Sequence, residues 1–141
     1  MEQIIEFAGN HPMLAAGFVA VVALLLWSEL TRHTRGFREV TPAEAISMIN
    51  SSDTQIVDIS PAKDFNAAHI VGARHFAPSR FEKPDKEIEK MKEGKVLVVC
   101  KSGQTALQTA GRLVKLGVGE VAVLKGGMTQ WKSDNYPVTS D

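Results

Sequence analysis

The chain has little cysteine, no excess charge of either sign and no repeats or low-complexity tracts. Cys100 is the only cysteine among 141 residues, which excludes an intrachain disulfide and any zinc site that needs several thiolates. The four histidines, His11, His33, His69 and His75, are too scattered to suggest metal ligands, so we expect neither a metal nor a cofactor. Sixteen basic and sixteen acidic residues cancel, which argues against nucleic acid as a partner.

One apolar stretch stands out in a chain long enough for one domain and an appendage. Residues 13–27 contain no charged side chain, and as a helix they would measure about 22 Å, less than the roughly 30 Å hydrocarbon core of a membrane. The flanking residues can extend this helix, and Trp27 suits the membrane interface. We therefore expect residues 1–30 to form an N-terminal segment with one transmembrane helix over about residues 12–30.

The alternatives to an anchor are a cleaved signal peptide and a soluble core helix. A signal peptide begins with positive charge, but residues 1–12 carry Glu2 and Glu6 and neither lysine nor arginine, and no small-residue cleavage site follows. A core helix is disfavoured because the apolar run has no polar face. The sequence therefore favours a membrane anchor.

The charges after this helix predict its orientation. Arg32, Arg35 and Arg38 lie in residues 31–39, which we interpret as a basic juxtamembrane linker. Positive charge favours the cytoplasmic side, so we expect a single-pass protein of the inner (plasma) membrane with its N-terminus outside. Cys100 would then lie in the cytoplasm, a compartment that keeps thiols reduced.

Residues 40–138 are expected to form the folded domain. Thr41, Pro42 and Glu44 are typical of a helix start, and helical patterns also cover residues 61–68, 82–93 and 106–116. Between them, residues 55–59, 95–99 and 120–124 form apolar runs typical of buried strands. This alternation predicts an α/β fold with a central, mostly parallel sheet flanked by helices, and ligands bind such sheets beyond the carboxyl ends of the strands. Asp58 and Cys100 fall near such ends.

Cys100 separates a predicted strand from a short loop, residues 101–105, and a predicted helix that begins at Ala106. Backbone N–H groups and the helix dipole at such a position favour negative charge, so the thiolate would be stabilised and exposed as a nucleophile. The alternative is a buried cysteine at the end of a strand. These residues alone leave both interpretations open.

Three motifs together resemble the rhodanese domain family over about residues 39–137. The first joins residues 57–59 with Asp64, Phe65 and residues 68–73; the second is residues 100–105; the third is residues 124–131. The resemblance implies a small α/β domain that transfers sulfur through a cysteine persulfide. The chain departs from the family at three positions, with Ser60 in place of arginine, Ala68 in place of glycine and Val71 in place of proline.

The resemblance also implies roles for individual residues. Cys100 would attack the outer sulfur of a donor such as thiosulfate, expel sulfite and pass its persulfide sulfur to a thiophilic acceptor. The residues expected to bind the substrate or persulfide through the loop amides are Lys101, Ser102, Gly103, Gln104 and Thr105. Thr105 is alternatively expected to cap the following helix. Asp58 and His69 are expected to support the structure of the site, and Trp131 with the Gly126–Gly127 turn is expected to close the core.

Two other functions remain open from the sequence. A phosphatase of the related dual-specificity type places an arginine after a loop one residue longer, but the corresponding position here is Ala106. A membrane-tethered binding module with an incidental thiol is the second alternative. For the transferase, the expected partners are a small sulfur donor, a thiol or other thiophilic acceptor, the membrane and possible membrane-protein partners.

Overall fold

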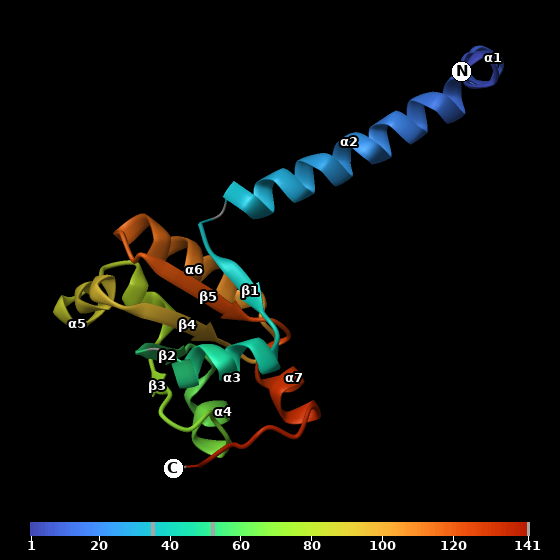
Figure 1. Cartoon of the computed structure of the whole chain (residues 1–141). Coiled ribbons are helices and arrows are strands. Elements are labelled where there is room, and N and C mark those ends of the chain that lie inside the picture. Colours follow the sequence, from blue (N-terminus) through green and yellow to red (C-terminus); the bar gives the residue numbers. More distant parts are fainter. Residues whose placement is uncertain (35, 52, 141) are drawn as a thin grey trace. The chain divides into compact units, whose positions relative to one another are not determined.

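The computed structural model describes residues 1–34, 36–51 and 53–140, with side chains except at residues 32–34. The chain divides into two units, Met1–Arg35 and Gly36–Asp141. Figure 1 shows the helices of the first unit and the sheet of the second.

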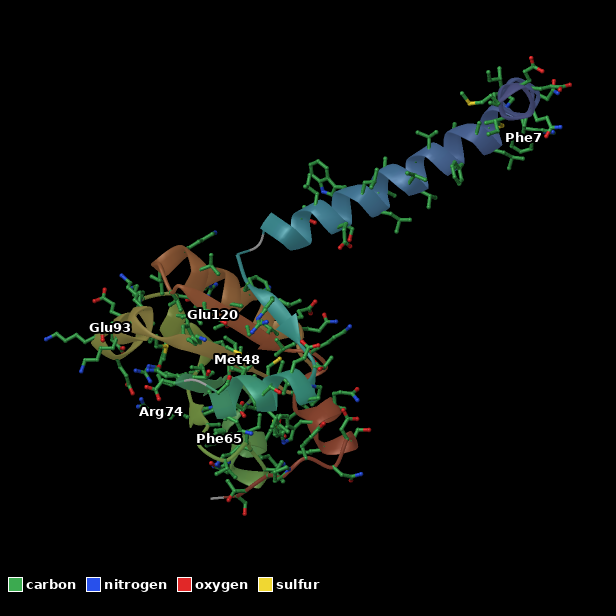
Figure 2. All side chains as sticks on the ribbon, in the orientation of Figure 1. Phe7, Met48, Phe65, Arg74, Glu93 and Glu120 are labelled. Atoms are coloured by element: carbon green, nitrogen blue, oxygen red, sulfur yellow. The ribbon has the colours of Figure 1, made fainter. Side chains whose placement is uncertain are left out.

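The N-terminal unit consists of two helices, α1 (Glu2–Asn10) and α2 (Pro12–Thr34). Helix α2 has 23 residues and is therefore about 34 Å long, enough to cross the hydrocarbon core that residues 13–27 alone would not span. Its candidate span, Pro12–Thr31, has a mean hydropathy of 2.1 and buries none of its surface within the structure. Figure 2 shows the side chains of α2 projecting from all sides of the helix. Arg35 and the side chain of Arg32, on which the orientation argument partly rests, lie outside the described residues.

The second unit is built on five parallel strands in the order β1-β5-β4-β2-β3. The strands are β1 (Arg38–Val40), β2 (Thr54–Asp58), β3 (Arg74–His75), β4 (Lys95–Val99) and β5 (Glu120–Leu124). In register, Asp58 pairs with Val99, so the carboxyl ends of β2 and β4 lie side by side. The α/β fold with a central parallel sheet expected from the sequence is confirmed.

Each face of the sheet has its own apolar core, because alternate side chains of a strand point to opposite faces. Val96, Val98 and Cys100 belong to one core with residues of helix α6 (Gln104–Leu116). Leu97 and Val99 belong to the other, with residues of α3 (Pro42–Ser51) and α7 (Gly127–Ser133). Figure 1 shows α6 on one side of the sheet and α3 on the other. Coverage of both faces explains why the strands are continuously apolar.

The local signals in the sequence place several helix starts correctly. The Glu44 N–H donates to Thr41 Oγ1 at 3.3 Å, which confirms Thr41 as the cap of α3. The helix expected over residues 61–68 is α4 (Ala62–Ala67). Helix α6 ends at Gly117, whose φ of 100° suits glycine, as expected.

The helix expected over residues 82–93 is wrong as a single element. The structure instead has a 3₁₀ turn, η1 (Pro78–Phe81), a short helix, α5 (Lys86–Glu89), and a second 3₁₀ turn, η2 (Lys90–Glu93). Asp85 starts α5, since its Oδ1 accepts from the Ile88 N–H at 3.1 Å. A hydrogen bond from the Arg80 guanidinium, followed by that from Ile88, lowers the pKa of Asp85.

Neither edge strand was expected from the sequence. Arg38 and Glu39, interpreted as part of a linker, lie in β1 and pair with Ala122 and Val123 of β5. Strand β3 has two residues, of which Arg74 is exposed. Short edge strands have one partner each and bury few side chains, so they lack the apolar run by which central strands are found.

We expect Leu97→Ala to lower the free energy of unfolding of the sheet domain by about 2–5 kcal/mol, because Leu97 is fully buried in the central strand. Urea unfolding of the detergent-solubilised full chain, followed by near-UV circular dichroism, measures this loss. Leu24→Ala in α2 is the matched control, since Leu24 is 69% exposed and should leave the transition unchanged. Equal effects of the two substitutions would contradict the assignment of the core.

Candidate active site

Cys100 follows directly after β4, beside the carboxyl end of β2. Its side chain is 3% exposed, and its Sγ accepts a hydrogen bond from the Gly103 N–H at 2.9 Å. A main-chain donor aimed at sulfur stabilises negative charge there without moving any side chain. The burial agrees with a strand-end cysteine, whereas the bond to Gly103 is the anion-stabilising contact expected of a nucleophile.

The loop after Cys100 is shorter than expected, because α6 begins at Gln104 and not at Ala106. The residue before the first helical turn is Gly103, with a φ of 90°, and no side chain caps this turn. Gly103 therefore adopts a left-handed conformation that suits glycine, and the role of Thr105 as the helix cap is wrong. Lys101, Ser102, Gln104 and Thr105 are all exposed around the buried Gly103.

The turn of Gly126 and Gly127 holds this loop from the other side. The Met128 N–H donates to Cys100 O at 2.8 Å, and the Thr129 N–H donates to Lys101 O at 3.0 Å. Gly127 has a φ of 59°, and a Cβ there would come 2.2 Å from Cys100 O, which leaves no room for a side chain. The two glycines, interpreted from sequence as closing the core, thus also position the cysteine loop.

Asp58 is fully buried next to this loop. Its Oδ1 accepts from the Ser60 N–H at 2.9 Å, so the carboxylate caps its own turn, while its main-chain neighbour Ile59 donates to Val99 O at 2.8 Å. Among the described residues, Asp58 Oδ2 and Ser60 Oγ are buried and have no hydrogen-bond partner. Support of the site by Asp58 remains a prediction. The hydrogen bond that its side chain makes lies within the turn after β2.

His69 lies among structural contacts. It is 5% exposed, its Nδ1 lies 2.7 Å from Phe65 O, and its ring stacks on that of Phe65 at 3.9 Å between centroids. Its main chain exchanges two hydrogen bonds with Thr139, which ties the C-terminal segment to the residues after α4. Figure 2 marks Phe65 on α4. These contacts agree with a supporting role, which remains a prediction.

The chemistry open to this site is that of a cysteine whose sulfur accepts a hydrogen bond from a main-chain N–H group. Within the described residues there is no group of three or more histidine, cysteine, aspartate or glutamate side chains able to hold a metal ion. Cys100, the Gly103 amide and the exposed loop side chains lie within a few residues of one another. Such an arrangement suits covalent catalysis at Cys100.

A family model for the rhodanese-like domain matches residues 41–134. The chain belongs to this family. The matched residues include strands β2 to β5, the cysteine loop and the glycine turn, and leave β1 and the N-terminal helices outside.

Relatives extend this comparison. An uncharacterised Escherichia coli protein, YibN, is 33% identical over 139 residues, covering 98% of this chain and 97% of that protein. The thiosulfate sulfurtransferase GlpE of Coxiella burnetii is 30% identical over 105 residues, covering 74% of this chain and 94% of its own. The similarity to YibN therefore includes the N-terminal helices.

A solved structure from Rhodopseudomonas palustris, described as a possible tyrosine phosphatase, is similar to the rhodanese-like domain. It matches with a TM-score of 0.65 and 25% identity, covering 73% of this chain and 85% of that one. The fold is therefore shared by proteins to which different chemistries are attributed, and the choice between them rests on the loop.

Sequence reasoning missed two features of this site. The contact of Gly127 with Cys100 O joins segments far apart in the chain, and its only sequence signal is a pair of adjacent glycines after a buried strand. Ser60, noted as a departure from the family, is buried with a hydroxyl that has no partner within the described structure. The burial of Ser60 has no signal in the sequence.

We expect Gly127→Ala to destabilise the domain by at least about 1–3 kcal/mol, the usual cost of a left-handed backbone at a residue with a side chain, because its Cβ would also collide with Cys100 O. Urea unfolding of the full chain measures this. Gly119→Ala is the control, since a Cβ there meets no atom within 4 Å and should change stability by less than about 0.5 kcal/mol. An unchanged midpoint for Gly127→Ala would refute the close approach.

Proposed function

We propose that this protein is a sulfurtransferase that carries sulfane sulfur on Cys100. The observation that carries the proposal is the hydrogen bond from the Gly103 N–H to Cys100 Sγ, in a loop that exposes Lys101 and Ser102. The relationship to the thiosulfate sulfurtransferase GlpE supports the same chemistry. Because the negative charge on sulfur is stabilised by the main chain, the site needs neither a second catalytic side chain nor a metal for this step.

The proposed reaction has two steps. The Cys100 thiolate attacks the outer sulfur of thiosulfate; the S–S bond of the donor breaks, sulfite leaves with the electron pair, and Cys100 holds a persulfide anion. An acceptor thiol then attacks the outer sulfur of this persulfide, the S–S bond at Cys100 breaks, and the thiolate is restored. The loop amide stabilises the anionic sulfur in both states.

Phosphatase chemistry is the second candidate, because the R. palustris structure is described as a possible tyrosine phosphatase. Phosphate transfer through cysteine calls for a guanidinium that clamps the phosphoryl oxygens. The corresponding residue here, Ala106, is fully buried in the first turns of α6 and offers no donor from its side chain. The loop therefore favours sulfur over phosphate.

We further propose that α2 anchors the domain to the inner membrane with the rhodanese-like domain in the cytoplasm. The length and hydropathy of α2 support the span, and Arg38 together with Arg32 and Arg35 supports the orientation through the positive-inside rule. A cytoplasmic location keeps Cys100 available as a thiol. The tether would restrict the transferase to acceptors at or near the membrane.

Incubation with thiosulfate is expected to add one sulfur atom to the protein, because the Cys100 thiolate displaces sulfite. Intact-mass spectrometry of the full chain, without reductant, detects the adduct, and Cys100→Ser is expected to show none. Hydrolysis of p-nitrophenyl phosphate is expected to stay at background in the same preparation. Phosphatase turnover without a sulfur adduct would reverse the assignment. The absence of both activities would favour a tethered binding module.

Protease treatment of membrane vesicles tests the orientation. We expect the C-terminal domain to be digested in inverted vesicles and protected in right-side-out vesicles, because the arginines after α2 favour the cytoplasm. Immunoblotting against a C-terminal tag reads the result, with a known periplasmic protein as the control for vesicle sidedness. Digestion from the outside would contradict the proposed topology.

A further inference from the structure

A pocket of about 210 Å³ adjoins the cysteine loop. Its lining comes from the turn after β2, from α4 and the residue after it, from the loop and from α7; the residues are Ser60, Asp64, Ala68, Lys101, Met128, Thr129 and Lys132. Lys101 is next to the nucleophile, and Met128 and Thr129 are the residues whose amides bind the loop carbonyls. The pocket is smaller than the roughly 300–1,000 Å³ that holds a drug-sized ligand, so it suits a small molecule.

The pocket contains a polar group that the protein does not satisfy. Ser60 is 3% exposed and lines the pocket, yet its Oγ has no hydrogen-bond partner among the described residues. A buried hydroxyl without a partner costs free energy that a ligand can recover. Ser60 stands where arginine is usual in the family, and its unsatisfied hydroxyl can both donate and accept a hydrogen bond.

Charged side chains of both signs line the pocket. Asp64 belongs to α4, while Lys101 belongs to the loop and Lys132 to the last turn of α7. The lysines favour a carboxylate, and the aspartate favours an ammonium group. Met128 and Ala68 add apolar surface to the lining.

We propose that this pocket binds the sulfur acceptor, and that the acceptor is a small thiol carrying both a carboxylate and an ammonium group. Lys101 and Lys132 hold the carboxylate, Asp64 holds the ammonium group, and Ser60 Oγ forms a hydrogen bond with the ligand. This inference rests on the proposed sulfur transfer and names the acceptor class for the same site. Neither the loop motif nor the family relationship assigns Ser60, Asp64 or Lys132 to it.

The transfer step balances without an oxidant. The acceptor thiol RSH attacks the outer sulfur of the Cys100 persulfide anion, a new S–S bond forms, and the bond between the outer sulfur and Cys100 Sγ breaks. The electron pair of the broken bond stays on Cys100 as thiolate, and the product is the persulfide RSSH. The Gly103 N–H donates to the departing sulfur, as it does in the structure.

Single-turnover discharge of the persulfide tests the proposal. The full chain in detergent is loaded with thiosulfate, and loss of the added sulfur is followed by intact mass with cysteine, 3-mercaptopropionate, cysteamine or 2-mercaptoethanol. Lys132→Gln is expected to slow cysteine and 3-mercaptopropionate by about threefold or more, and Asp64→Asn to slow cysteine and cysteamine similarly, while 2-mercaptoethanol is unchanged. Dividing each rate by that of the wild type cancels the different intrinsic reactivities of the thiols.

Lys115→Gln is the matched control, because it removes an exposed lysine from the last turn of α6, outside the pocket. It should leave all four rates unchanged. Uniform slowing of all four thiols by Lys132→Gln, or no slowing of any, would overturn the proposal.

A binding experiment separates failure of the pocket from failure of the sulfur chemistry. Cys100→Ser is titrated with S-methylcysteine, which has both charges but no thiol, and amide shifts are followed by NMR of the full chain in micelles. Shifts at Ser60, Thr129 and Lys132, weakened in the double variant with Ser60→Ala, support the pocket even if wild-type protein takes up no sulfur. Absence of these shifts refutes the pocket even if sulfur transfer is found.

Discussion

The site depends on the close approach of two main-chain segments, the loop after β4 and the turn after β5. Met128 donates to Cys100 O at 2.8 Å, and Gly127 comes so near that any side chain there would overlap the loop carbonyl. Gly103 faces the same turn, since a Cβ on it would lie 3.0 Å from Gly126 N. The carbonyl of Cys100 is held by α7, and its Sγ accepts a hydrogen bond from the Gly103 N–H. Gly126 and Gly127 therefore position the main chain of Cys100, while the Gly103 N–H contacts its sulfur.

A parallel sheet makes this approach possible. Strands β2, β4 and β5 run side by side, so the segments that leave their carboxyl ends meet at one edge although they are far apart in sequence. The turn after β2 brings Ser60, the loop after β4 brings Lys101, and the turn after β5 leads into α7 with Lys132. Charged and polar side chains from three connections are thereby placed around one small pocket beside the cysteine. Cys100 and the candidate acceptor pocket lie together because the carboxyl ends of these parallel strands lie at one edge of the sheet.

The two units of the chain differ in where their apolar side chains lie. The sheet domain buries its apolar side chains between two layers of helices, as in any water-soluble protein. Helix α2 exposes about two-thirds of the surface of each of Leu24, Leu25 and Leu26. Consecutive exposed apolar side chains are stable where the surroundings are themselves apolar. The similarity to YibN covers both units, whereas that to GlpE covers 74% of the chain.

Local patterns were enough to predict the α/β class, the central strands, the cap at Thr41 and the cysteine at a strand end, because each has a signal in periodicity, capping or turn chemistry. The sequence also predicted an apolar helix over about residues 12–30, close to the candidate span Pro12–Thr31. Tertiary structure alone decided the edge strand β1, the start of α6 at Gln104, the contact of Gly127 with the loop and the burial of Ser60. These features arise between segments that are distant in the chain. Steric exclusion and pairing with a remote strand determine them, and neither interaction leaves a pattern among neighbouring residues.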